Sequence, residues 1–168
     1  MKSITTFILV FTFILTNCSG SNLRTKSNNK EHYNTDTIKL DSTYLETGWY
    51  YIVDNDNNFQ RQLDKSNDTF FIDPRPIVTA KNFMKFEIYT SRYGDVGLSI
   101  LLDKKGTKNW SIATEKAIGN YLAFILDNKL LQVARVNSQI TVGVTALNRG
   151  DYSKEELEKI RTIIENEK

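Results

Sequence analysis

Runs of apolar residues that fit the two-residue period of a β-strand follow one another along most of the chain after residue 44. Residues 122–126 are apolar at every position, which is typical of a strand buried on both faces. Between residues 140 and 146, apolar residues alternate with Thr and Gly, which predicts a strand with one buried face. The expected buried face is Ile140, Val142, Val144 and Ala146. Further strands are expected near residues 49–53, 59–63, 69–72, 86–88, 98–102 and 129–133.

Two segments have the spacing of amphipathic helices. The first is residues 107–118, and the second follows Ser153 and Glu156, which are spaced as a capping box. Their apolar stripes are Trp110, Ala113, Ala117 and Ile118 in the first helix and Leu157, Ile160, Ile163 and Ile164 in the second. Two amphipathic helices on one face of a mostly antiparallel sheet make an α+β fold, which is the predicted class.

The pair Asp127-Asn128 predicts a tight turn after the buried strand. Both residue types tolerate positive φ, so the chain can return directly into the strand at residues 129–133. The resulting hairpin is the expected centre of the sheet.

An earlier polar run, residues 54–58, superficially resembles a calcium loop. Such a loop needs Gly where Phe59 stands and Glu where Lys65 stands, and the sequence has neither. A hairpin turn of residues that bond their own backbone is the better interpretation. We therefore expect the strand at residues 49–53 to return into the strand at 59–63.

The N-terminal segment has a different character. Lys2 is followed by an almost wholly apolar run from Ile4 to Leu15, which is typical of a secretory signal and short for a membrane span. The run ends in Leu-Thr-Asn-Cys, which resembles the lipobox of bacterial lipoproteins. The resemblance implies a signal peptide at residues 1–17 and lipidation of Cys18, and hence a membrane anchor. A free thiol at the end of an uncleaved anchor is the alternative.

A polar segment, residues 18–43, separates this signal from the expected folded domain at residues 44–168. It has too few apolar residues to offset its ordering entropy, so we expect a flexible tether. The single histidine, His32, lies in this tether, where no held partner is expected for a metal-binding or catalytic role. Ser-Gly after the cysteine lacks the aspartate associated with inner-membrane retention. This favours a lipid anchor in the outer membrane, with the folded domain facing the periplasm.

Composition and charge exclude several classes of function. Lys and Arg total 22 against 20 acidic residues, and no basic block stands out, so a nucleic-acid partner is not expected. The folded domain contains neither cysteine nor histidine, which excludes Cys–His and Ser–His catalysis. Carboxylates such as Asp73, Asp95, Asp103, Asp127 and Asp151 fall at turns, where local hydrogen bonding explains them. We expect no enzyme activity, no cofactor and no metal; a small enzyme with an unrecognised carboxylate site is the alternative.

Short motifs in the second half of the chain follow one pattern. Residues 106–110 (Gly-Thr-Lys-Asn-Trp) open a helix that leads into the buried strand, and 133–137 (Val-Ala-Arg-Val-Asn) then precede Ile-Thr-x-Gly at 140–143. Gly150 and the capped helix follow, and the Pro-containing segment 73–79 comes before. Together these motifs resemble the head subdomain of the first periplasmic domain of SecD (SecDF), the membrane partner of the protein-export channel. The resemblance covers about residues 70–166 and rests on turns and caps.

This resemblance implies a module that grips or shields an emerging polypeptide. We expect no proton coupling, because no transmembrane helix follows the signal segment. The expected function is therefore non-catalytic binding of a protein or polypeptide partner in the cell envelope. An accessory role in protein export or in lipoprotein assembly is the alternative.

Polar residues gather at the two ends of the predicted strand 140–146. These rim residues are Arg135, Asn137, Ser138, Gln139, Asn148 and Arg149. Because the apolar positions of the strand account for its burial, we expect the rim side chains to be exposed. Arginine and amide side chains can bond the backbone carbonyls of an extended chain without reading its sequence. The rim residues are therefore the predicted partner-binding residues, and a merely solvated loop is the alternative.

Overall fold

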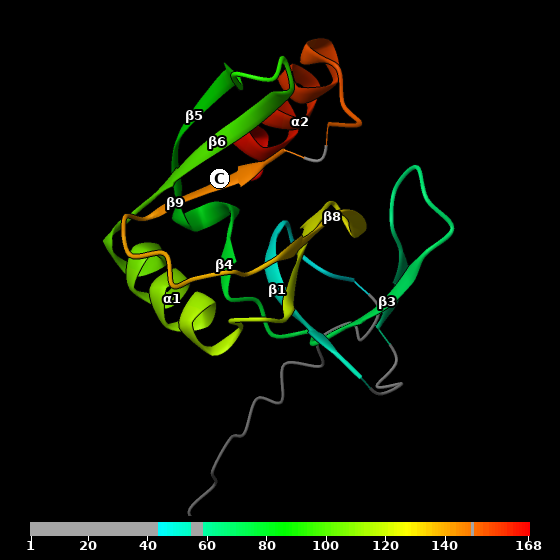
Figure 1. The fold of residues 1–168 in the computed structure, drawn as a ribbon, viewed down its shortest axis with the longest axis vertical. Helices are drawn as coiled ribbons and strands as arrows, with labels where there is room; N and C mark the ends of the chain where they lie inside the picture. The colour runs from blue at the N-terminus through cyan, green and yellow to red at the C-terminus, as the bar shows by residue number, and fades with distance from the viewer. Residues whose placement is uncertain (1–43, 55–58, 149) are drawn as a thin grey trace, which may run out of the picture. The chain divides into compact units, whose positions relative to one another are not determined.

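The computed structural model describes residues 44–54, 59–148 and 150–168, which form an α+β fold (Figure 1). Two α-helices accompany strands that pair antiparallel with one another. The predicted fold class is confirmed, although the strands form two sheets rather than one. The predicted signal peptide, Cys18 and the tether with His32 lie outside the described residues.

The larger sheet has the strand order β2-β3-β1-β7-β8, and β4 pairs with β1 outside this path. Its strands are β1 (Gly48–Val53), β2 (Gln60–Gln62), β3 (Thr69–Ile72), β4 (Val78–Thr79), β7 (Tyr121–Leu126) and β8 (Lys129–Arg135). β7 lies between β1 and β8, and its residues from Leu122 to Leu126 are all buried. The continuous apolar run correctly predicted this strand, because a central strand covered on both faces needs apolar residues at successive positions.

The first predicted hairpin is wrong, because β3 lies between β1 and β2. Ile72 of β3 is paired with Ile52 of β1, and Phe70 of β3 is paired with Arg61 of β2. β2 has the sequence Gln-Arg-Gln and no apolar side chain to bury, whereas Ile72 is part of the core. Burial therefore favours β3 as the neighbour of β1. Residues 55–58 of the predicted turn at 54–58 lie outside the described residues.

The smaller sheet has the order β5-β6-β9. Its strands are β5 (Phe83–Thr90), β6 (Val96–Leu102) and β9 (Val144–Leu147), and a short 3-10 helix, η1 (Ala80–Asn82), leads into β5. Gly94 has a φ of 89° in the turn that joins β5 to β6. The strands predicted near residues 86–88 and 98–102 are confirmed within these longer strands.

β9 is shorter than predicted and buries the opposite set of side chains. Thr145 and Leu147 are buried, whereas Val142 is 74% exposed. The reason lies at Gly143, which has a φ of 68° and lies so close to Thr107 that an added Cβ would be 2.2 Å from the Thr107 hydroxyl oxygen. This left-handed residue interrupts the alternation, so residues before and after it do not share one face.

α1 (Lys104–Lys116) begins earlier than predicted because Asp103 caps it. The Asp103 carboxylate accepts a hydrogen bond from the Gly106 N–H (2.5 Å), which satisfies one of the free donors of the first turn. The predicted apolar stripe is buried except for Ile118, which lies beyond the end of the helix and is exposed.

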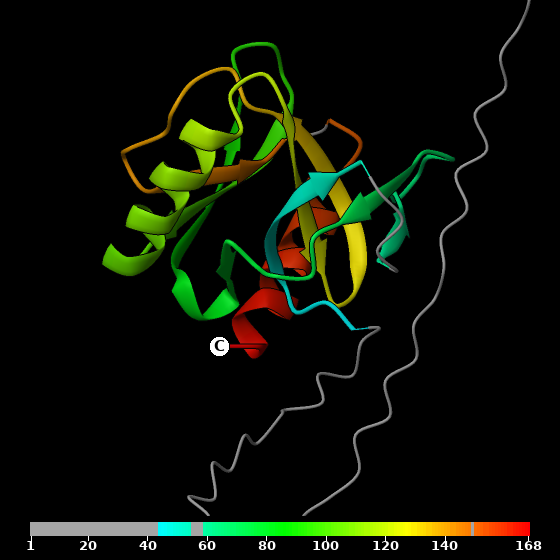
Figure 2. The same cartoon turned by 90° about the horizontal axis from the view of Figure 1, so that it is seen from below.

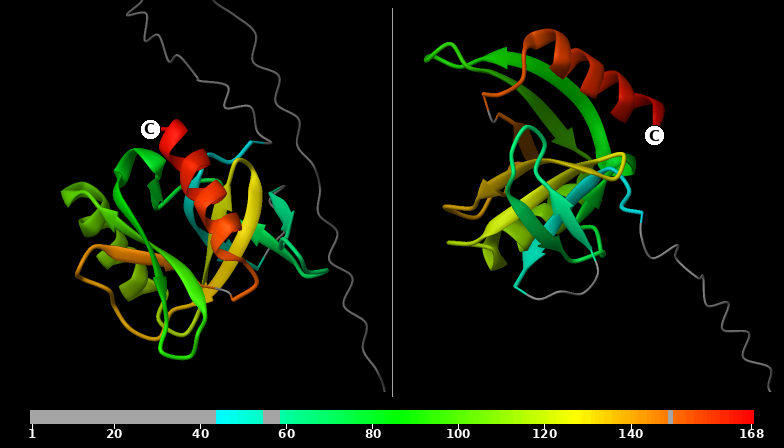
Figure 3. Two further views of the ribbon diagram at one scale, coloured as in Figure 1. Left: turned by 90° about the horizontal axis from the view of Figure 1, so that it is seen from above. Right: turned by 90° about the vertical axis from the view of Figure 1, so that its right-hand side faces the viewer.

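α2 (Lys154–Asn166) begins at the predicted capping box. The Ser153 Oγ accepts from the Glu156 N–H (3.2 Å), and the Glu156 carboxylate accepts from the Ser153 N–H (2.7 Å). α2 lies against β5 and β6, whereas α1 lies against β4 and β6. Figures 2 and 3 show the two helices apart from one another, each over its own part of the fold.

The main core is built from both sheets and both helices. Five large aromatic side chains lie in it, namely Trp49, Phe83, Trp110, Phe124 and Tyr152. The Trp49 ring centroid lies 5.1 Å from that of Trp110 and 5.2 Å from that of Phe124. A smaller cluster around Tyr50 packs on the other face of the larger sheet. The two tryptophans thus tie β1 to α1.

The turn between β7 and β8 allows a first stability test. Asp127 and Asn128 have the predicted positive φ (44° and 66°), and the Asn128 Oδ1 also accepts from the Leu45 N–H (3.0 Å) and the Arg61 Nη2 (2.6 Å). Asn128→Gly keeps the backbone conformation but loses these bonds, at about 1 kcal/mol each. Asn128→Val loses them and adds backbone strain of about 1–3 kcal/mol.

We therefore expect the free energy of unfolding, measured in urea, to fall from wild type to Asn128→Gly and again to Asn128→Val. Asn128→Asp is the control, because it keeps an acceptor oxygen at the same place. Equal unfolding midpoints for the glycine and valine variants would contradict the strain at this turn.

Candidate functional site

A cleft of about 400 Å³ lies between β8 and β9, which end the larger and the smaller sheet. The core contributes Trp49, Trp110 and Leu122 to its lining; β8 and the residues after it contribute Gln132, Ala134, Arg135, Val136, Asn137 and Ser138; and β9 with its flanks contributes Ile140, Val144, Thr145, Ala146 and Asn148. We call this site the β8–β9 cleft. Its volume falls in the range of about 300–1,000 Å³ that is usual for ligand sites.

Four of the six predicted rim residues line this cleft. Arg135, Asn137, Ser138 and Asn148 come from both of its sides, and their side chains are exposed as predicted. Gln139 does not line it, because its side-chain amide donates to the Ser111 hydroxyl on α1 (3.0 Å). Arg149 lies outside the described residues. That the rim residues bind a partner stays a prediction.

Gln132 holds the two sides of the cleft together, and the sequence analysis missed it. Its side chain is buried, with 3% exposed. The Gln132 Nε2 donates to the Ala146 carbonyl (3.2 Å), and the Gln132 Oε1 accepts from the Asn148 N–H (2.8 Å). The signal was present, because Gln132 is the only polar residue within the apolar run from Leu130 to Val133. Both halves of its amide are satisfied, as burial of an amide requires.

The segment between β8 and β9 is fixed on α1. The Thr114 Oγ1 accepts from the Ile140 N–H (2.9 Å), and Thr114 itself is buried and donates to the Trp110 carbonyl (2.9 Å). Gly143 lies against Thr107, which is about two helical turns before Thr114 on α1. These contacts hold the rim residues at a set distance from β9, so the cleft is a preformed feature of the fold.

Two buried hydrogen-bond donors line the cleft without a partner. The indole Nε1 atoms of Trp49 and Trp110 bond to no atom of the described residues. Both side chains are almost fully buried, and both contribute to the cleft lining. Sequence analysis correctly placed Trp110 in the core, but the unpaired donors depend on tertiary packing. A buried donor without an acceptor costs about 1–3 kcal/mol, so each indole favours an acceptor brought to it.

The chemistry of the described lining residues suits binding. Arg135 supplies a guanidinium, Asn137 and Asn148 supply amides, and Ser138 supplies a hydroxyl; no carboxylate is among them. Within the described part of the chain, no group of His, Cys, Asp and Glu residues is placed to hold a metal ion. The cleft can therefore donate to carbonyl oxygens and accept from N–H groups, which are the groups of an extended backbone.

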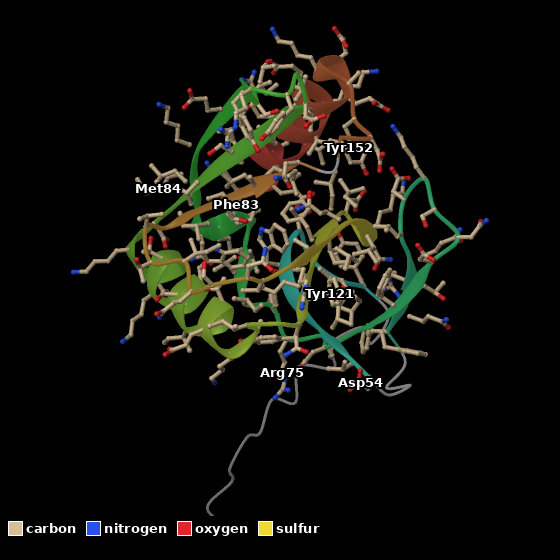
Figure 4. All side chains as sticks on the ribbon, in the orientation of Figure 1. Asp54, Arg75, Phe83, Met84, Tyr121 and Tyr152 are labelled. Atoms are coloured by element: carbon tan, nitrogen blue, oxygen red, sulfur yellow. The ribbon has the colours of Figure 1, made fainter. Side chains whose placement is uncertain are left out.

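A wider hollow of about 860 Å³ lies at the end of the domain where Figure 4 labels Asp54, Arg75 and Tyr121. Two of its charged groups, Asp73 and Arg75, already satisfy one another. The Arg75 Nη2 lies 2.6 Å from the Asp73 Oδ2, and the hydrogen bonds from Arg75 hold the pKa of the Asp73 carboxyl below its usual value. None of the unpartnered buried donors found in the described residues lines this hollow. The β8–β9 cleft is therefore the stronger candidate.

Comparisons with known proteins agree on one family. The protein-family model of the SecDF P1 head subdomain matches residues 56–166 of this chain. A crystal structure of SecDF in its super-membrane-facing form superposes with a TM-score of 0.58 at 17% sequence identity, covering 73% of this chain and 18% of that chain. A structure of SecDF, described as a membrane component that enhances protein export, has a TM-score of 0.58 at 16% identity, covering 73% of this chain and 63% of that chain.

The chain thus spans less than two thirds of the length of either SecDF chain. A search of curated proteins found no significant match. Within the residues that the structure describes, no helix combines the length and the apolar character needed to cross a membrane. The family match begins earlier than the predicted resemblance, which covered about residues 70–166, so β2 and β3 belong to the shared fold as well.

Proposed function

Because this chain belongs to the family of the SecDF P1 head subdomain, we propose that it is a non-catalytic binding module with a role related to protein export. Its partner is a protein or polypeptide in the cell envelope. The SecDF structure with the same fold is described as enhancing protein export, and we assign the binding part of such a task to this head module.

The location follows from the N-terminal sequence. The proposed lipid anchor at Cys18 and the tether of residues 18–43 keep the domain near a membrane surface. We place it at the outer membrane, facing the periplasm, where it can meet chains that have crossed the inner membrane.

One observation carries the proposed function: the fold brings Arg135, Asn137, Ser138 and Asn148 together around a preformed cleft. These residues come from two segments that are separated by β9, and a solvated loop needs no such convergence. Their side chains offer hydrogen-bond donors and acceptors in the mixture that a passing backbone requires. The charge of Arg135 adds attraction to carbonyl oxygens without selecting a sequence.

Charge reversal at Arg135 tests this function. Arg135 is exposed, so Arg135→Glu is expected to change the free energy of unfolding by about 1 kcal/mol or less. In crosslinking with mass spectrometry in the native envelope, the variant is expected to lose most of the polypeptides that wild type captures. Arg92→Glu is the matched control, because Arg92 is also exposed and does not line the cleft. Retention of every wild-type partner by Arg135→Glu would show that the rim is a solvated loop.

The same crosslinks separate the proposed function from its alternative. The alternative is an accessory role at the export machinery or in lipoprotein assembly, where the partner is one resident protein. A varied set of captured polypeptides supports a holding module, whereas one dominant partner present at fixed stoichiometry supports the accessory role.

A further inference from the structure

β9 ends the smaller sheet, so one of its edges is paired with no strand of the described residues. The Leu102 N–H donates to the Gly143 carbonyl (2.8 Å), and Thr145, two residues on, is paired with β6 in the same register. In an antiparallel ladder, alternate residues direct both backbone groups to the partner strand, and the residues between them direct theirs away. Val144 and Ala146 therefore direct their N–H and C=O groups away from β6, toward the β8–β9 cleft.

The Gln132 side chain already occupies part of this edge. It donates to the Ala146 carbonyl (3.2 Å) and accepts from the Asn148 N–H (2.8 Å). One residue of a parallel neighbouring strand makes the same two bonds, with its own N–H and C=O, to residues two apart. The carboxamide thus imitates one residue of an added strand. The backbone groups of Val144 and the Ala146 N–H remain, and no described residue is bonded to them across the cleft.

The other side of the cleft is closed at one end. At the start of β8, the Leu130 carbonyl accepts from the Asp64 N–H (2.8 Å), and the Leu131 carbonyl accepts from the Tyr152 hydroxyl (3.3 Å). The cleft lining begins beyond these residues, at Gln132, and continues to Ser138. The result is a slot that is blocked where Gln132 bonds Asn148 and open toward Arg135, Asn137 and Ser138.

We propose that an extended polypeptide segment enters this slot and adds to the β9 edge as a strand, bonding the backbone of Val144 and Ala146. This inference rests on the proposed function and states how the module holds its partner. Backbone bonding suits varied partners, because every residue except proline offers both an N–H and a C=O. The unpaired indoles of Trp49 and Trp110 favour small inward side chains that carry an acceptor, such as serine or threonine.

Intrinsic fluorescence measures this binding, because the chain has two tryptophans and both line the cleft. The full chain is titrated in detergent with a synthetic peptide of alternating threonine and valine, flanked by lysines for solubility. A matched peptide carries an N-methyl group on each inner residue, which removes the N–H groups and keeps every side chain. We expect the methylated peptide to bind about tenfold more weakly, because it loses the hydrogen bond to the Val144 carbonyl, worth about 1 kcal/mol, and its methyl groups obstruct close approach to the strand edge.

Val144→Pro tests the same edge from the side of the protein. The Val144 N–H points away from β6, so proline removes the proposed donor without removing a bond within the sheet. Val144→Ala is the matched control, because it changes the side chain and keeps the N–H. We expect Val144→Pro to bind the unmethylated peptide about tenfold more weakly than Val144→Ala. Circular dichroism checks that both variants are folded. If the proline variant is unfolded, the comparison of the two peptides on wild type decides the question alone.

The outcomes separate this inference from the proposed function. Equal affinities of wild type for the two peptides would overturn strand addition, and capture of polypeptides in the envelope would still support the proposed function. Failure of wild type to bind any peptide and to crosslink any polypeptide would overturn both. A dimer in sedimentation that Val144→Pro dissociates would assign the edge to a second copy of the chain and overturn the inference.

Discussion

Phe124→Ala is expected to lower the free energy of unfolding by about 3–5 kcal/mol, a large share of the stability of a domain of this size. Phe124 has no exposed surface and lies in β7, the strand between β1 and β8. Its ring centroid lies 5.2 Å from that of Trp49 on β1 and 6.3 Å from that of Phe83 on β5. Truncation therefore removes packing from both sheets at once and leaves a cavity between them. Urea unfolding followed by circular dichroism measures the loss.

Tyr121→Ala is the matched control for this substitution. Tyr121 is the first residue of the same strand, but its side chain is 49% exposed. Its removal is expected to cost about 1 kcal/mol or less, because most of its surface already faces water. A similar loss for the two variants would mean that Phe124 is not the centre of the core. A selective loss for Phe124→Ala, with a changed tryptophan fluorescence, would tie the core directly to the lining of the β8–β9 cleft.

Local patterns in the sequence predicted the elements that depend on near neighbours. Five consecutive apolar residues predicted β7, because a strand buried on both faces needs an apolar side chain at every position. Asp127 and Asn128 predicted the positive φ of their turn, and Ser153 with Glu156 predicted the start of α2. In each case, the physical cause lies within a few residues of its effect.

The order of the strands depends on contacts between distant residues and was not predicted. Residues 49–53 and 59–63 both read as strands, and a hairpin was the simplest connection. Either β2 or β3 can pair with the edge of β1. β3 takes this place because pairing there buries Ile72. Similarly, nothing local to Gly143 indicates that it packs against Thr107 of α1. Its left-handed conformation at this contact reverses the buried face of β9.

The candidate site shows the same division. Polarity and position in the sequence identified Arg135, Asn137, Ser138 and Asn148, and the fold gathers them at one cleft. Gln139 is equally polar but is bonded to Ser111 on α1, a contact that its own sequence neighbours do not indicate. Gln132 was overlooked because it lies in an apolar run. Its role becomes visible only in the fold, where its side chain bonds the edge of β9 in the other sheet.

Cys18→Ala is expected to abolish lipid attachment completely. In the lipobox chemistry that Leu-Thr-Asn-Cys resembles, a diacylglyceryl group is attached to the cysteine sulfur, and cleavage then frees the cysteine amine for acylation. Alanine has no sulfur, so neither step follows and the unprocessed precursor accumulates. Metabolic labelling with radiolabelled palmitate is expected to mark the wild type and to leave the variant unmarked. Because stable anchoring takes more than one acyl chain, the anchor depends on both steps.

Ser19→Ala is the control for this prediction, because it changes the adjacent position and keeps the thiol. It is expected to be labelled as strongly as wild type. The alternative, an uncleaved anchor with a free thiol, predicts that a maleimide reagent modifies wild type, and Cys18 is the one cysteine that can react. A lipidated Cys18 has its sulfur in a thioether and cannot react. Palmitate label on Cys18→Ala, or maleimide modification of mature wild type, would contradict the lipid anchor.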